Sequence, residues 1–385
     1  MLALDQLNGT CAPAFSSLAT EFAQLFNSPE QRGAALCVMH EGEVVVDLWA
    51  GYSDRARTQP WQENTLVNLF SAGKPIISAA ILLLVEQGKL ALERPVADYW
   101  PAFAQAGKEQ ISVAQLLNHQ AALPAISQPL PAQALYEWST MTQALAAQAP
   151  WWTPSATHHG YAPMTFGWLT GELVRQVTGL MPGEFIQQSL CQPLALDLYL
   201  GLTAEQLTRV SDVSRLKTGG DNAAQQLMAR LQQPQSLPHL AFNNPPGMLN
   251  QTNTPQWRTM QQPAANIHGT ARALASFYHA LLSGQLLEPA SFANMCRQHS
   301  VGLDQTLGLA TRFGLGVLLD QTQPATARFN LFANSFGHPG AGGTLGCANA
   351  AKNVAFAFVT NSLGPYVLMD PRAQRLTHKV TELLS

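Results

Sequence analysis

Two stretches rich in β-forming residues lie near opposite ends of this chain, and they constrain its fold more than any other feature. Residues 33–54, GAALCVMHEGEVVVDLWAGYSD, form two apolar runs on either side of Glu41-Gly42. Residues 344–361, TLGCANAAKNVAFAFVTN, form two more runs with a turn expected near 351–353. Each pattern is typical of a β-hairpin. Because helical periodicity fills the part between them, we expect the two ends to share one antiparallel sheet.

Between these stretches, two segments have the periodicity of amphipathic helices. In residues 163–179, apolar side chains recur on one face, and Gly179 follows as the expected C-cap. The side chains of that face are Phe166, Leu169, Leu173 and Val177. Residues 270–287 form a second predicted helix with a glycine stop. Residues 232–263 are instead rich in Pro, Gln and Asn, which predicts a long loop, either a linker-like excursion or a lid over a site.

The predicted fold class is α/β of the α+β type, an antiparallel sheet flanked by helices plus a mostly helical inserted domain. We expect the sheet domain to be discontinuous, with residues 1–90 and 265–385, and the helical domain to comprise residues 91–264, with the loop near 232–263 in it. A chain of 385 residues is long enough for roughly two to three domain-sized units.

The composition excludes several classes of protein. Hydrophobic residues make up 46% of the chain and charged residues 12%, which is typical of a globular protein. The net charge is −3 and no long basic or acidic run occurs, so nothing indicates a nucleic-acid partner or an anionic membrane surface. The run AAILLLVEQG at 79–88 is too short to span a bilayer.

The N-terminal residues and the cysteines give an expectation for the location of the protein. The stretch MLALDQLNGTCAPAF has no basic residue and no long apolar run, and it includes Asp5, which argues against a secretory signal. The five cysteines are scattered and odd in number, without CxxC or metal-ligand spacing. We therefore expect reduced thiols, a cytoplasmic location and no metal or other cofactor.

In the stretch FSAGKP, Ser71 lies three residues before Lys74. Pro75 follows Lys74 and directly precedes a strongly apolar run. Residues three apart on a helix lie on one face, so the two side chains can meet. A serine hydroxyl becomes a good nucleophile when a base takes its proton, and a lysine can be that base if desolvation lowers its pKa. The apolar run provides that desolvation. Because Pro75 has no N–H, it fits only the first turn of a helix and so places Ser71 at the helix N-terminus.

A serine and a lysine at this spacing also occur by chance, with the lysine solvated, so other residues must decide. Three further stretches follow in order: LLNHQAALP (116–124), HGYAPMTFGWLTGELVRQVTG (159–179) and GHPGAGG (337–343). With FSAGK, this set resembles the serine β-lactamase and penicillin-binding-protein superfamily, most closely the family VIII carboxylesterases, which are similar to class C β-lactamases. The resemblance runs from about 33 to 361. It implies a β-lactamase/transpeptidase-like fold with the active site between the sheet and the helical domain.

The resemblance implies three catalytic residues. Ser71 would be the nucleophile and Lys74 its partner, and Tyr161 matches the tyrosine of the YxN motif of the family. Tyr161 would act with Lys74 as general base and then as acid toward the leaving group. A phenol beside a lysine ammonium is expected to have a lowered pKa. Which of Lys74 and Tyr161 takes the first proton stays open, because the two would titrate as a coupled pair.

The stretch HPGAGG corresponds to the KTG motif of the family, which lies on the edge strand beside the active site. The resemblance implies an oxyanion hole made by the backbone N–H groups of Ser71 and Ala341. Glycines around Ala341, Gly340 among them, would let a substrate approach the strand closely. We reject a literal KTG at 217–219, because a polar and then helical stretch follows it rather than a strand.

Two departures from the family pattern concern substrate recognition. His338 stands where the family has the lysine of KTG, and it would be a weaker, pH-dependent cation for a substrate carboxylate. Pro163 stands where the family has the asparagine of YxN and offers no polar group to an acyl-side-chain amide. Both changes disfavour β-lactams and D-Ala-D-Ala peptides, whereas uncharged esters need neither group. The chain has no GxSxG motif, which excludes an α/β-hydrolase.

Aromatic residues precede Tyr161 and could line an apolar acyl or alcohol pocket, or belong to the core of the helical domain. They are Tyr136, Trp138, Trp151 and Trp152. We name four candidates for substrate binding: Tyr136, Trp152, His338 and Gly340. We expect His119 to be structural. His158, His159 and His268 lack the spacing of a metal site.

The sequence therefore predicts a serine carboxylesterase that hydrolyses short-chain carboxylic esters through an acyl-enzyme on Ser71, with a small-molecule substrate and an unknown oligomeric state. The alternatives within the same fold are a β-lactamase, a D-aminopeptidase or other amide hydrolase, and an acyltransferase. A non-catalytic scaffold relative is the remaining alternative, against which the intact Ser71, Lys74 and Tyr161 argue.

Overall fold

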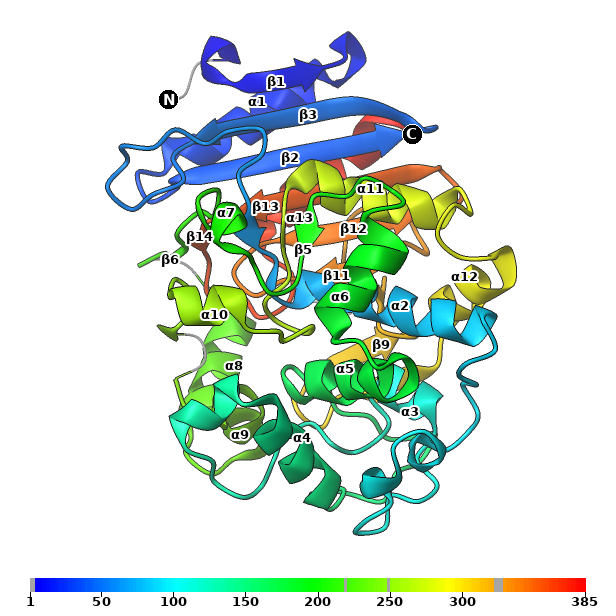
Figure 1. Cartoon of the computed structure of the whole chain (residues 1–385). Helices are drawn as coiled ribbons and strands as arrows, with labels where there is room; N and C mark the ends of the chain where they lie inside the picture. The colour runs from blue at the N-terminus through cyan, green and yellow to red at the C-terminus, as the bar shows by residue number, and fades with distance from the viewer. Residues whose placement is uncertain (1–3, 218–219, 248–249, 322–327) are drawn as a thin grey trace.

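Both ends of the chain contribute strands to one antiparallel sheet, which confirms the central prediction from the sequence. The computed structural model describes residues 4–217, 220–247, 250–321 and 328–385, and within these ranges the sheet has nine strands. In spatial order they are β1 (Asn8–Cys11), β3 (Glu43–Gly51), β2 (Gly33–His40), β13 (Val354–Thr360), β12 (Leu345–Asn349), β11 (Phe336–Pro339), β10 (Leu318–Leu319), β9 (Ala310–Phe313) and β8 (Ser300–Leu303). Figure 1 shows the blue strands β2 and β3 beside the orange-to-red strands β12 and β13.

The two predicted hairpins are both present. Strands β2 and β3 pair in antiparallel register, with His40 opposite Glu43. The two turn residues between them, Glu41 and Gly42, have φ angles of 51° and 89°. Positive φ at both central residues is the geometry of the hairpin turn that matches the twist of its strands. Strands β12 and β13 pair in the same way, with Asn349 opposite Val354.

Helices cover both faces of the sheet because its side chains alternate. On one face, Leu36 and Val38 pack with α1 (Ser16–Gln24) and α13 (Pro371–Leu383) in one apolar cluster. On the other face, Ala35 and Cys37 belong to a second apolar cluster, which also holds α11 (Ala271–Leu282). A strand that is buried on both faces reads as a continuous apolar run, as β2 does.

The middle of the chain is mostly helical. Its helix α5 (Thr165–Thr178) is the one predicted from the apolar face, and Gly179 ends it with a φ of 75°. Helix α2 (Lys74–Glu86) is almost entirely buried and packs against α5 and α6. The other helices are α3 (Val113–Leu117), α4 (Trp138–Ala147), α6 (Pro182–Ile186), α7 (Ala204–Leu207), α8 (Asn222–Gln232), α9 (Leu237–Asn243), α10 (Pro255–Thr259) and α12 (Pro289–Cys296).

Two small sheets tie the predicted helical domain to the rest of the chain. Strands β4 (Val67–Asn68) and β5 (Leu198–Tyr199) both pair with β7 (His268–Gly269). Strand β6 (Ser214–Arg215) pairs in parallel with β14 (Ser362–Leu363). The domain boundaries at residues 90 and 264 remain a proposal.

Two details of the predicted elements differ from the structure. The segment 232–263 is not one loop, because it contains α9 and α10. Both helices begin with a serine or threonine N-cap, Ser236 or Thr254, and a proline in the first turn, which are strong start signals within an otherwise loop-like composition. Helix α11 ends at Leu282, before the predicted end, because Gly284 takes a φ of 73°.

Across the described ranges, no helix has both the length and the apolar character that crossing a membrane requires.

Candidate active site

Ser71 lies in a short 3-10 turn, η4 (Phe70–Gly73), directly before α2. The sequence predicts Ser71 in the first turn of the helix. In the structure the first turn of α2 contains Pro75, and Ser71 lies just before that turn. Phe70 is buried and has a φ of 50°, in the left-handed region that side chains other than glycine rarely adopt. Such a strained residue persists only where surrounding contacts hold it, so the backbone that leads into Ser71 is held in place by its neighbours.

Lys74 is the first residue of α2 and is completely buried. Its Nζ lies 3.0 Å from Ser71 Oγ. Nζ also lies 2.9 Å from the carbonyl oxygen of Pro163 and 3.0 Å from that of Ala264. Burial disfavours the charged form, and it lowers the pKa of Lys74 well below its usual range. The desolvation expected from the apolar run is therefore present.

The three neighbours of Lys74 Nζ match the hydrogen-bonding groups of a neutral amine. A neutral amine has two N–H groups and one lone pair. The carbonyl oxygens of Pro163 and Ala264 can only accept, so they take both N–H groups. The lone pair is then left for Ser71 Oγ, whose hydroxyl can donate its proton to Nζ. In its neutral form, Lys74 is thus placed to act as a general base toward Ser71.

Tyr161 contacts the serine from the other side. Its hydroxyl donates to Ser71 Oγ over 2.8 Å, and Lys74 Nζ lies 4.9 Å from the centroid of its ring. Burial raises the pKa of Tyr161 above its ordinary value. The lowered pKa expected from the sequence is wrong, because that expectation assumed a charged lysine and ignored the burial of the phenol. Tyr161 is a hydrogen-bond donor to the serine oxygen in its resting state.

Residues that the sequence did not single out hold Tyr161 in place. The carboxylate of Asp304 is completely buried and accepts from the backbone N–H of Tyr161 over 2.9 Å. Burial raises the pKa of Asp304 to about 6, although the N–H groups that donate to it oppose the shift. The ring of Phe313 is stacked on that of Tyr161 at a centroid distance of 6.0 Å. The sequence around Asp304 has the signature of an Asx turn, but nothing local predicts its contact with Tyr161.

His119 packs beside the same tyrosine and is structural, as predicted. Its Nδ1 accepts from the backbone N–H of Ala162 over 3.3 Å, and its ring contacts those of Tyr161 and Phe313. Burial lowers the pKa of His119 well below its ordinary value. His119 is therefore neutral.

The end of β11 and the turn after it lie against the Ser71 segment. Strand β10 pairs only with Phe336 and Gly337, so within the described residues the last part of β11 has no partner strand on that side. β11 is thus an interior strand of the sheet with a locally open edge, rather than the edge strand that the resemblance implies. A Cβ atom on Gly340 would collide with the carbonyl oxygen of Leu69, two residues before Ser71. Glycine is needed at this position because the two backbones approach closely.

Ala341 occupies the tip of that turn. The N–H groups of its neighbours Gly340, Gly342 and Gly343 donate to the carbonyl oxygens of Thr344, Tyr366 and Gly340. Among the backbone hydrogen bonds of the described residues, none has the N–H of Ala341 as donor. A free N–H in a turn that packs against the segment of Ser71, the candidate nucleophile, is what an oxyanion hole needs.

His338 differs from the expectation of a pH-dependent cation. It is 1% exposed, and its Nδ1 lies 2.8 Å from the carbonyl oxygen of Pro339. Burial is the main cause that lowers the pKa of His338 to about 3, so the ring is neutral at physiological pH. Because a carbonyl oxygen only accepts, Nδ1 carries the proton and Nε2 is an acceptor. His338 is stacked on Tyr161 and cannot replace the missing lysine as a carboxylate anchor.

Only some of the four aromatic residues that could line a substrate pocket lie next to the site. The indole of Trp152 packs against Gly160, which directly precedes Tyr161. Tyr136 is half-buried at the end of a 3-10 turn, η7 (Ala132–Tyr136). Trp138 donates to Glu172, and Trp151 donates to the carbonyl oxygen of Ala125. A role of Tyr136 and Trp152 in substrate binding stays a prediction.

An apolar pocket of about 180 Å³ borders Phe70 and Ala341. Neither Tyr136 nor Trp152 belongs to its lining. Most of its wall comes from the segment around α8 and α9 and from the segment after β14. Its main apolar side chains are Leu216, Met228, Leu231, Phe242, Leu363 and Val367. The sequence offered only the idea of a lid near 232–263, because these residues meet through tertiary contacts and not through a shared motif.

Within the described part of the chain, no three His, Cys, Asp or Glu side chains gather where they could hold a metal ion. His159 instead contacts Thr311, His268 contacts the carbonyl oxygen of Asn266, and His158 is exposed. Of the rejected KTG, Thr218 and Gly219 lie outside the described residues, and the helix that begins at Asn222 follows them.

Comparison with known proteins gives a consistent result. The model of the Beta-lactamase family matches residues 18–379. An esterase/beta-lactamase, LipL, from Mycobacterium tuberculosis is 32% identical over 375 residues, which cover 94% of this chain and 85% of that protein. Two solved structures are similar over 98% of this chain and 99% of their own. One is a penicillin-binding protein homolog from Caulobacter crescentus (TM-score 0.86, 33% identity), and the other is a family VIII carboxylesterase (TM-score 0.87, 30% identity).

The pH dependence of labelling at Ser71 tests the roles of Lys74 and Tyr161. A fluorophosphonate should label Ser71 faster as the pH rises through the lowered pKa of Lys74, because only the neutral amine accepts the serine proton. The rate should then stay level to at least about pH 10. An ordinary tyrosine has a pKa of about 10, and the pKa of Tyr161 is raised above that value. The labelling rate is measured by mass spectrometry from pH 5 to pH 10.

Two lysine variants serve as test and control for that profile. Lys74→Arg keeps a permanent positive charge and should slow labelling by roughly 10²–10⁴-fold. Lys108 is equally buried, and its Nζ donates to the carbonyl oxygens of Gln105, Ala146 and Gln148. Lys108→Arg should leave the labelling rate unchanged. A labelling rate that is independent of pH in the wild type, or unaffected by Lys74→Arg, would contradict these roles.

Proposed function

The chain belongs to the beta-lactamase family, a family of serine hydrolases, and we propose that it is a carboxylesterase that hydrolyses short-chain, uncharged esters through an acyl-enzyme on Ser71. One observation carries this proposal: Ser71 Oγ lies between a desolvated lysine and a protonated tyrosine, 3.0 Å from Lys74 Nζ and 2.8 Å from the Tyr161 hydroxyl. A base on one side and a proton donor on the other are the two groups that acyl transfer to a serine needs.

In the first step, Ser71 Oγ attacks the ester carbonyl carbon and its proton passes to Lys74 Nζ. The negative charge that develops on the carbonyl oxygen is stabilised by the backbone N–H groups of Ser71 and Ala341. When the C–O bond of the ester breaks, Tyr161 donates its proton to the departing alkoxide and receives the proton held by Lys74. The products of this step are the free alcohol and an acyl group on Ser71, with Lys74 neutral again.

In the second step, water replaces the alcohol and the same groups act in reverse. Lys74 and Tyr161 remove a proton from the water as its oxygen attacks the acyl carbon. The same N–H groups stabilise the second oxyanion. Ser71 leaves with a proton returned to its Oγ, and the carboxylic acid departs. Both steps use the same residues, because hydrolysis of the acyl-enzyme is the reverse of its formation with water in place of the alcohol.

The recognition groups favour esters over lactams and D-amino acid peptides. His338 is neutral and Pro163 offers no side-chain polar group, so the positions that would meet a substrate carboxylate and amide are uncharged or apolar. The wall of the pocket beside Ala341 is mostly apolar and its volume is limited, which suits a short acyl chain. Arg215 is the one charged residue among the described side chains that line it, so burying a cationic group there without a partner would cost free energy.

Lactam hydrolysis is the second candidate function. The observation in its favour is the similarity of the chain to a protein described as an esterase/beta-lactamase, at 32% identity over 94% of this chain. A lactam and an ester are both acyl donors to a serine, so one site can act on both at different rates.

Substitution of the nucleophile tests the proposed function. Ser71→Ala should abolish hydrolysis of p-nitrophenyl butyrate, a loss of at least about 10³-fold, because no acyl-enzyme can form. Ser78 provides the control, because it is a buried serine of α2, one turn after Lys74, and its hydroxyl donates to the carbonyl oxygen of Lys74. Ser78→Ala should retain the wild-type rate. The rates are followed by release of p-nitrophenolate, with nitrocefin as the competing substrate in parallel.

The two candidate functions predict opposite orders of rate in that assay. An esterase should have a higher kcat/KM for p-nitrophenyl butyrate than for nitrocefin. Turnover of nitrocefin that exceeds that of every ester would establish the lactamase instead. Ester hydrolysis that persists in Ser71→Ala would refute both candidates, because both act through Ser71.

The pocket beside Ala341 makes a separate prediction about acyl chain length. Leu231→Trp places a larger side chain in the wall of the pocket and should lower kcat/KM for p-nitrophenyl octanoate by about tenfold or more relative to p-nitrophenyl acetate. Phe26 is a half-buried apolar residue that does not line this pocket, and Phe26→Trp should leave the ratio of the two rates unchanged. An equal loss on both esters in Leu231→Trp would mean that the acyl chain lies elsewhere.

A further inference from the structure

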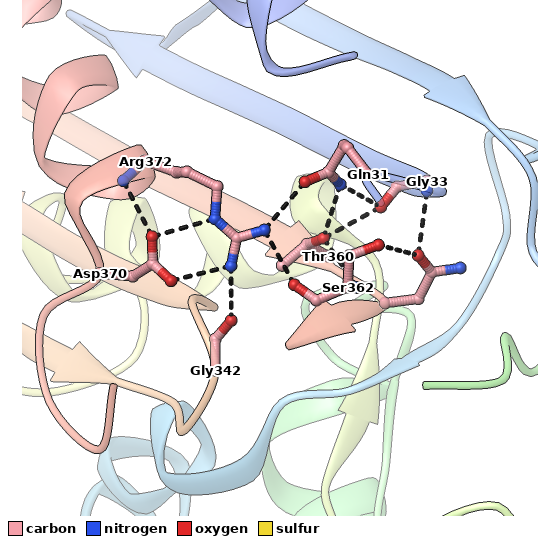
Figure 2. A network of polar contacts seen from close by, with 8 residues as sticks. Gln31, Gly33, Gly342, Thr360, Ser362, Asp370 and Arg372 are labelled. Carbon is pink, nitrogen blue, oxygen red and sulfur yellow. Dashed lines mark hydrogen bonds and ion pairs between the residues drawn. The ribbon is translucent and has the colours of Figure 1, made fainter. Parts of the chain in front are cut away.

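A largely buried arginine, Arg372, connects Gln31, Ser362 and Asp370 to the turn that holds Ala341. Arg372 lies in the first turn of α13, and its side chain is 15% exposed. Its guanidinium donates to both carboxylate oxygens of Asp370, at 3.0 and 2.8 Å. It also donates to Gln31 Oε1 and to the carbonyl oxygen of Ser362, each at 2.8 Å. Figure 2 shows that one further N–H reaches the carbonyl oxygen of Gly342, also at 2.8 Å.

The contact with Gly342 is made by the same guanidinium nitrogen, Nη2, that binds Asp370. Asp370 is 2% exposed, so its carboxylate is held in place by burial and by its bonds to Arg372. A Cβ atom on Gly343 would lie 2.7 Å from Nη2, which means that the guanidinium packs directly under the backbone of the turn. The position of the turn therefore depends on the position of this side chain.

The rest of the turn is anchored to the same region. The N–H of Gly342 donates to the carbonyl oxygen of Tyr366, and the N–H of Gly364 donates to that of Gly342. Within the turn, the N–H of Gly343 donates to the carbonyl oxygen of Gly340. Gly342 and Gly343 have φ angles of 90° and 125°, which glycine adopts without cost, so the turn has little conformational preference of its own. External bonds must fix its shape.

We propose that Arg372 is a positioning residue for the oxyanion hole: by holding the carbonyl oxygen of Gly342, it fixes the direction of the free N–H of Ala341. This inference rests on the proposed function, in which that N–H meets the developing oxyanion. Arginine suits the role because its planar group donates five N–H bonds in fixed directions, whereas a lysine nitrogen offers three donors from a single point. Arg372 acts through Ala341 and does not itself touch the substrate.

A displaced N–H should affect catalysis in a characteristic way. The oxyanion exists in the transition state and not in the bound ester, so a weakened oxyanion hole lowers kcat and leaves KM almost unchanged. Removal of one oxyanion-hole donor elsewhere costs about 10²–10³-fold in kcat, and a misplaced donor should cost somewhat less. Lys74 is not part of this network, so the pH dependence of the rate should be unchanged.

The test compares Arg372→Lys with a matched arginine variant. Arg258 is 11% exposed, pairs with Asp212 and donates to the carbonyl oxygen of Ser211, but it has no contact with the turn. Arg372→Lys should lower kcat for p-nitrophenyl butyrate by about tenfold to 100-fold, with KM within about threefold of wild type. Arg258→Lys should change neither constant by more than about twofold.

A second substrate separates an oxyanion effect from a general structural one. In the thiono ester, sulfur replaces the carbonyl oxygen and accepts hydrogen bonds weakly, so a correctly placed N–H contributes less to its reaction. Wild type should therefore prefer the oxygen ester strongly, and Arg372→Lys should reduce that preference. Loss of the same factor on both esters, loss expressed in KM alone, or kcat within about twofold of wild type would overturn the proposal.

Arg372→Ala provides a second variant in which the missing group can be supplied from solution. Millimolar guanidinium should restore part of kcat on the oxygen ester in Arg372→Ala and should have no such effect on Arg258→Ala. The absence of any recovery in folded Arg372→Ala would count against the proposal. If the wild type lacks Ser71-dependent ester hydrolysis, the proposed function is wrong. If the wild type hydrolyses esters and substitution of Arg372 leaves the rate unchanged, only the role of Arg372 is wrong.

Discussion

A lysine nitrogen buried against two backbone carbonyl oxygens is the interaction on which the rest of this site depends. Pro163 and Ala264 accept from Lys74 Nζ, and burial lowers the pKa of the amine. The same burial raises the pKa of Tyr161, because desolvation disfavours a cation and an anion alike. One physical cause therefore favours the neutral form of both groups. The proposed base and proton donor then lie on either side of Ser71 without any counter-charge.

The fold places these groups by bringing together segments that are far apart in the sequence. Ser71 precedes α2, Tyr161 precedes α5, Ala264 lies between α10 and β7, and Ala341 lies between β11 and β12. Strand β11 occupies its position because both ends of the chain share one sheet (Figure 1). The turn at Ala341 is packed on the Ser71 segment from one side and braced by Arg372 from the other (Figure 2).

Local patterns predicted much of this architecture and the identity of the central residues. The hairpin at Glu41-Gly42 and the helix that ends at Gly179 follow from short-range rules, and the structure contains both. The SxxK spacing correctly predicted that Ser71 and Lys74 meet. The neutral state of His338 was not predictable, because it depends on burial among residues distant in sequence. Three further features were not predictable for the same reason, because each joins residues that are distant in sequence. They are the contact of Asp304 with Tyr161, the pocket around Leu231 and the hydrogen bonds of Arg372 to the turn.

The central claim, that Lys74 is a neutral amine in the folded protein, can be measured directly. The chain has six lysines, so lysine labelled with ¹³C at Cε gives few resonances, and that of Lys74 is assigned by its absence in Lys74→Arg. Titration by NMR should give Lys74 a pKa well below the value of about 10.4 that solvated lysines show. A Lys74 resonance that titrates together with those of the exposed lysines would contradict the account.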